Sequence, residues 1–142
     1  MFNPSLREVR SFFVEAWRKR RSGAVASPMD AMAADWVASH PEYHADIESP
    51  GALDADYEVG QGRTNPFLHL SMHLAISEQL SIDQPPGIRA AFDALAARLD
   101  SPHDAAHEVM ECLGRVIWES QRNGTMPDND GYLDCIRRRA SQ

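Results

Sequence analysis

Histidines are the residues of this chain whose type and spacing indicate chemistry. The sequence holds six of them, and each belongs to a pair separated by four positions: His40 and His44, His69 and His73, His103 and His107. Random placement of six residues in a chain of this length gives on the order of 0.2 such pairs, so three pairs form a real pattern. On an α-helix, side chains four residues apart lie on one face, where two imidazoles can reach one metal ion.

Carboxylates extend two of these pairs. Glu48 follows His44 by four residues and Glu111 follows His107 by four, so both stripes read His-x3-His-x3-Glu. Glu78 is five residues past His73, about 140° around the helix axis, and is not expected to be a ligand. We therefore predict a buried metal site whose ligands are the six histidines with Glu48 and Glu111.

The size of this ligand set bears on the metal. Six imidazoles and two carboxylates exceed the four ligands of a tetrahedral zinc ion. Nitrogen-rich ligation with bridging carboxylates suits a non-haem di-iron pair, and zinc is the alternative, with one histidine pair then left for structure or catalysis. The pattern loosely resembles the hemerythrin-type helical bundle, in which histidines and carboxylates from four helices hold two irons. Spacing leaves open whether Glu58 or Asn65 joins the site, and whether the histidines form a metal-free, pH-responsive network.

Helix-length segments, separated by glycine and proline, must position these side chains. No stretch alternates with period two, so strands are not expected. The sequence predicts an all-α, single-domain bundle of about five to six helices over residues 1–142, with a long loop at 51–64. Helical periodicity and capping residues place the helices at 4–21, from Pro28 to about Pro41, 65–80, 88–99, 101–122 and 130–139.

Pro41 interrupts the second of these helices between two candidate ligands. A proline removes one backbone donor and crowds the preceding turn, so the chain either starts a new short helix that reaches Glu48 or kinks. The His40–His44 pair is therefore the one whose helical geometry is in question.

Charge and cysteine content narrow the class of protein. A net charge of -7 argues against general nucleic-acid binding, which needs a basic face. No apolar run reaches the roughly 18 residues of a membrane span, and the amino terminus lacks a secretory apolar region, so neither a membrane nor secretion is expected. Cys112 and Cys135 form no CxxC motif, which favours reduced thiols in a cytoplasmic protein.

Several segments resemble one known family. The run of residues 65–79, NPFLHLSMHLAISEQ, is the most specific, and 40–44, 83–88 and 107–114 also match. The chain is similar over nearly its whole length to the uncharacterised bacterial domain-of-unknown-function family number 1841. This resemblance implies a whole-chain domain and no particular activity.

Three functions fit these observations. The first is a di-iron protein that handles or senses dioxygen, peroxide or nitric oxide. The second is a zinc hydrolase or transferase with Glu108, Glu111 or Glu58 as general base, although no HExxH motif is present. The third is a non-catalytic adaptor in which the histidines serve the fold and the 51–64 loop binds a protein partner.

Overall fold

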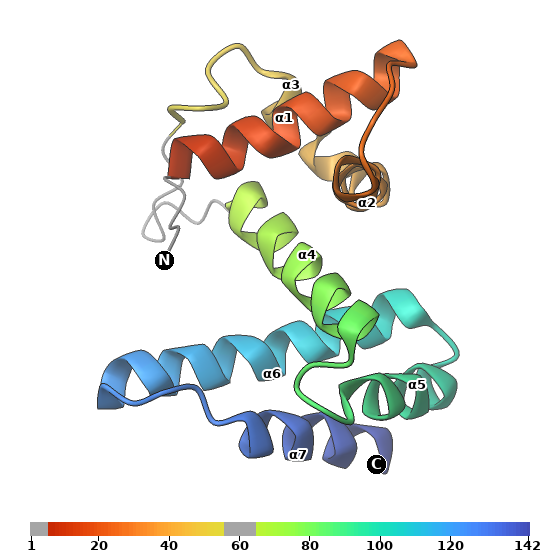
Figure 1. Cartoon of the computed structure of the whole chain (residues 1–142), viewed down its shortest axis with the longest axis vertical. Coiled ribbons are helices and arrows are strands. Elements are labelled where there is room, and N and C mark those ends of the chain that lie inside the picture. The colour runs from red at the N-terminus through yellow and green to blue at the C-terminus, as the bar shows by residue number, and fades with distance from the viewer. Residues whose placement is uncertain (1–5, 56–64) are drawn as a thin grey trace. The chain divides into compact units, whose positions relative to one another are not determined.

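The computed structural model describes residues 6–55 and 65–142 of the chain. These residues form seven α-helices and one 3₁₀-helix, and they form no strand, so the all-α prediction is confirmed (Figure 1). The helix count is higher than the five to six expected, because the segment after Pro41 forms separate helices. The elements are α1 (Leu6–Ser22), α2 (Pro28–Ala38), the 3₁₀-helix η1 (Pro41–Tyr43), α3 (His44–Glu48), α4 (Pro66–Ile82), α5 (Ile88–Leu99), α6 (Pro102–Asn123) and α7 (Asn129–Ala140).

The chain divides into two compact units, residues 1–74 and 75–142, with the boundary inside α4. The single-domain organisation stays a prediction. None of the described helices is long and apolar enough to cross a lipid bilayer.

The first unit is built where α1 packs on α2 and α3. Two helices contribute different kinds of side chain to its core. α1 supplies the aromatic rings of Phe13 and Trp17, and α2 supplies the smaller side chains of Ala33, Ala34 and Val37. Alanines at a helix contact let the two backbones approach closely, and the larger rings fill the remaining space.

Ion pairs hold the basic end of α1 in this unit. The run of residues 18–21 faces acidic side chains: Lys19 contacts Asp30 at 3.0 Å and Arg20 contacts Asp35 at 2.7 Å. Asp30 also completes a capping box with Ser27 at the start of α2, where each side chain bonds the other residue's backbone amide.

Arg10 anchors the beginning of the predicted loop. Its Nη1 donates to the carbonyl oxygens of Leu53 and Ala55 at 3.4 and 2.7 Å, and its guanidinium lies over the ring of Phe67. Residues 51–55 are therefore tied to α1. The rest of the predicted loop, residues 56–64, lies outside the described residues.

The second unit packs α5, α6 and α7 against one another. Leu95, Val109 and Ile136 are fully buried, one from each helix. Tyr132 is also buried, and its hydroxyl donates to Oε1 of Gln79 at 2.7 Å. Burial raises the pKa of Tyr132, so this phenol keeps its proton at neutral pH.

A disulfide between Cys112 of α6 and Cys135 of α7 corrects the expectation of reduced, separate thiols. The two cysteines are 23 residues apart in sequence, and only the packing of α6 on α7 brings them together. Sequence spacing carries no signal for such a pair.

Candidate metal centre

His69 and His73 lie on one face of α4, as their spacing predicts. The Nε2 atoms of the two rings are 3.1 Å apart, which is also a hydrogen-bond distance. A tetrahedral ion with Zn–N bonds near 2.05 Å holds its nitrogens about 3.3 Å apart, so this separation is close to that of two ligands of one metal. α4 is uninterrupted from Pro66 to Ile82, and Asn65 caps its start by accepting from the amides of Phe67 and Leu68.

His40 brings a third imidazole to this pair from the end of α2. Its ring centroid is 5.0 Å from that of His69 and 4.8 Å from that of His73. One ring nitrogen of each of the three histidines lies within 4.8 Å of the other two. An ion that held the three nitrogens at the spacing of a tetrahedral site would draw the third ring inward by up to about 1.6 Å.

A backbone carbonyl group sets the orientation of the His40 ring. Its Nδ1 lies 2.7 Å from the carbonyl oxygen of Trp36, which can only accept, so Nδ1 carries the proton. In the neutral form of this ring the lone pair is on Nε2, the nitrogen that a metal would use. Histidine ligands in metalloproteins are commonly oriented in this way by a carbonyl on the other ring nitrogen.

The cluster of His40, His69 and His73 is largely buried from solvent. His73 is fully buried and His40 is 3% exposed, whereas His69 is half-buried. Burial of several imidazoles is costly unless their nitrogens are satisfied, and a bound cation satisfies one nitrogen of each.

Two aromatic side chains pack around these rings. Trp36 stacks on His73 with centroids 3.9 Å apart, and Tyr43 stacks on His40 at 5.4 Å and meets His69 edge-on. The pKa of Tyr43 is raised by burial and then by the carboxylates of Glu42 and Asp46. Tyr43 therefore stays a neutral phenol at neutral pH. The sequence pattern did not single out Tyr43 as a neighbour of the histidines.

His44 has a different role from His40. Its Nε2 donates to the carbonyl oxygen of Val37 at 2.8 Å, and its ring lies 4.6 Å from that of Trp17. It does not belong to the group of described residues that could share one ion. The helix is interrupted before Pro41, and a new short helix begins at His44, so His40 and His44 do not share one helix face.

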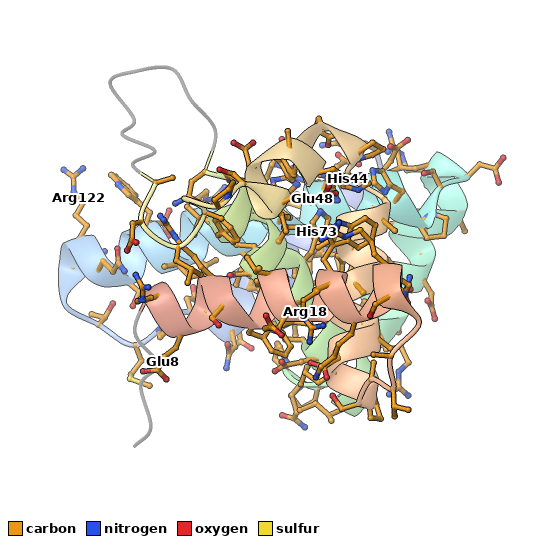
Figure 2. All side chains as sticks on the ribbon, turned by 90° about the horizontal axis from the view of Figure 1, so that it is seen from above. Glu8, Arg18, His44, Glu48, His73 and Arg122 are labelled. Atoms are coloured by element: carbon orange, nitrogen blue, oxygen red, sulfur yellow. A yellow bond between two sulfur atoms is a disulfide. The ribbon has the colours of Figure 1, made fainter. Side chains whose placement is uncertain are left out.

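Glu48 also contacts α1. Its Oε2 accepts from Nε1 of Trp17 at 3.0 Å, and its Oε1 lies 3.6 Å from Nη1 of Arg21. His44 and Glu48 project from α3, whereas His73 projects from α4 (Figure 2). The structure thus gives His44 and Glu48 packing contacts between helices, and their assignment as ligands stays a prediction.

The third pair lies in the second unit. His103 and His107 of α6 have ring centroids 4.5 Å apart, and Nδ1 of His107 donates to the carbonyl oxygen of His103 at 3.0 Å. They share one helix face, as their spacing predicts. Their role as ligands stays a prediction.

Two glutamates of α6 that the sequence offered as ligand or base contact α7, and those roles stay predictions. Glu111 forms an ion pair with Arg139, and Glu108 lies 3.6 Å from the same guanidinium. Both carboxylates therefore help to hold α6 on α7. The third candidate base, Glu58, lies outside the described residues.

Comparison with known proteins identifies the family. The model of the domain of unknown function DUF1841 matches residues 5–138, nearly the whole chain, so the chain belongs to that family. No curated protein and no solved structure matches it. The family resemblance is confirmed, and the hemerythrin-like ligand pattern stays a prediction.

Proposed function

Because the chain belongs to a family whose description assigns no activity, we propose a function from the site itself: this protein binds one divalent transition-metal ion through His40, His69 and His73. The observation that carries the proposal is the 3.1 Å separation of the His69 and His73 Nε2 atoms, with His40 beside them. Imidazole ligands suit zinc, iron and copper.

Three imidazoles leave a coordination position open. A metal held by three protein ligands keeps a site for water or a small molecule, the arrangement of catalytic rather than structural zinc. A small ligand such as water or a diatomic gas suits this position, because His40 and His73 are buried and Trp36 and Tyr43 pack against the rings.

One ion fits the contacts better than the pair of irons expected from the sequence. A di-iron centre needs carboxylates that bridge or complete the shell, whereas Glu48 contacts Trp17 and Arg21 and Glu111 contacts Arg139. The single-ion site and the di-iron centre differ in the number of metal ions bound per chain, so an experiment can distinguish them.

Elemental analysis of the untagged, purified protein tests the proposal. We expect one equivalent of zinc, iron or copper per chain, and the same content in Glu48→Gln. Two equivalents of iron that fall when Glu48 is changed would replace the single ion with the di-iron centre.

Thermal stability gives an independent readout. A metal that binds only the folded chain stabilises it by RT ln(1 + [L]/Kd), about 2.7 kcal/mol at a hundredfold excess over Kd. We expect zinc to raise the Tm of the chelator-treated protein and to leave that of His69→Ala unchanged. If zinc, iron(II) and copper(II) all leave the parent's Tm unchanged, the cluster is a buried imidazole network and the proposal fails.

A further inference from the structure

A basic pocket lies in the second unit, on α6 and α7. It has a volume of about 410 Å³, within the usual range for small-molecule sites. We define the arginine pocket by the residues that line it: Arg115, Gly131, Asp134, Arg137, Arg138 and Ser141. Three guanidinium groups and one carboxylate give it a local charge of opposite sign to that of the chain, whose net charge is -7.

Contacts with neighbouring carboxylates do not lock these arginines. Nη1 of Arg137 lies 4.0 Å from Oδ1 of Asp134, and Nε of Arg115 lies 3.3 Å from Oε1 of Glu119. Both arginine side chains are more than half exposed. Exposed pairs of this kind contribute little, so an anion with several oxygens competes well for the same donors.

The helix dipole explains only part of the positive charge of the arginine pocket. Basic residues are favoured in the last turn of a helix, which accounts for Arg137 and Arg138 near the end of α7. Arg115 is different, because it lies in the middle of α6 and still lines the same pocket. Arg139, the third basic residue of that turn, is instead held by Glu108 and Glu111.

We propose that the arginine pocket binds a small, soluble, phosphate-bearing ligand. The planar guanidinium group matches phosphate oxygens through two parallel N–H bonds, and positive groups from two helices suit a ligand with more than one negative charge. A small ligand suits the pocket better than a long nucleic-acid backbone, because a chain with a net charge of -7 repels a polyanion outside the pocket.

Titration of the chelator-treated protein with inorganic pyrophosphate tests this inference, with calorimetry as the readout. Removal of metal keeps the measurement independent of the histidine cluster. We expect a single site that Arg137→Gln combined with Arg138→Gln weakens at least about tenfold. The matched control is Arg122→Gln, which removes a charge from the same unit at a residue that contacts Trp118 and does not line the pocket. It should change the affinity less than about twofold.

Three results would overturn the proposal. They are no binding of pyrophosphate, equal weakening in the pocket and Arg122 variants, and binding only to vesicles that carry a phosphoinositide headgroup. The variants change exposed side chains, and matching far-UV circular dichroism and Tm values identify the affinity loss as local.

Discussion

Two histidine pairs of the first unit have the same spacing and different geometry. His69 and His73 lie on the unbroken helix α4, and their Nε2 atoms approach to 3.1 Å. His40 and His44 are separated by the start of η1 at Pro41, and their rings hydrogen-bond different carbonyl groups. A spacing of four residues therefore brings two side chains together only where the helix between them is continuous.

His40 and His44 donate hydrogen bonds to carbonyl oxygens near the end of α2. The last carbonyls of a helix lack partners within it, and near the end of α2 those of Trp36 and Val37 accept from the rings of His40 and His44. The two rings differ in which nitrogen does this. His40 uses Nδ1, which leaves Nε2 for the cluster, whereas His44 uses Nε2. The break at Pro41 thus brings a third imidazole beside the α4 pair and directs the His44 ring to Val37 and Trp17.

The largest effect should come from His73→Ala, which removes a ring of the continuous pair. His73 is fully buried and stacked on Trp36, so we expect the free energy of unfolding to fall by about 3 kcal/mol. Urea unfolding followed by tryptophan fluorescence measures this loss. Metal binding should disappear as well, and a variant that still bound one equivalent would remove His73 from the ligand set.

The local chemistry of helix starts made much of the fold predictable. Ser27, Asn65 and Ser101 cap α2, α4 and α6, because each side chain accepts from an amide two or three residues on. The His69–His73 contact was predictable for the same reason, since it depends on only four consecutive residues within one helix.

Contacts that do not follow from residue spacing account for the rest. The different hydrogen bonds of His40 and His44 depend on where α2 ends, and the stacking of Tyr43 on His40 depends on the path of η1. The Cys112–Cys135 disulfide depends on how α6 packs on α7. None of these relations is periodic in sequence, so no count of spacings could have found them.

Pro41→Ala should weaken metal binding without removing a ligand. The residue before a proline is kept out of the α-helical region, and loss of this restriction lets the end of α2 extend and reorient His40. We expect the metal Kd to rise about tenfold, the lower end of what loss of a supporting contact costs. Competition with a chelating dye measures it. Pro28→Ala is the control, because Pro28 also begins a helix but does not adjoin a histidine of the cluster. Equal changes in both variants would argue against the role given to the break.

His44→Gln tests the other half of the comparison. We expect the metal Kd to stay within about twofold and the free energy of unfolding to fall by about 1 kcal/mol, the usual net worth of one hydrogen bond. The reason is that the ring bonds Val37 and packs on Trp17. Isothermal calorimetry with zinc and urea unfolding provide the two numbers. A loss of affinity above about tenfold would return His44 to the ligand set predicted from spacing.

The smallest effect concerns the start of α2, the helix whose end orients both histidines. Lys19 and the Ser27 amide lower the pKa of Asp30, so the folded state favours its carboxylate. A lowered pKa gives stability that is complete above the unfolded pKa, about 3.9 for aspartate, and is lost as pH falls through the folded pKa. Asp30→Asn should therefore cost up to about 1 kcal/mol at pH 7 and almost nothing at the acid end, as measured by urea unfolding across that range. Asp35→Asn, whose exposed carboxylate lies further along α2 and caps no amide in the described contacts, should show a smaller loss at pH 7. If the cost of Asp30→Asn did not shrink with falling pH, the capping box would not be what ties Asp30 to the stability of α2.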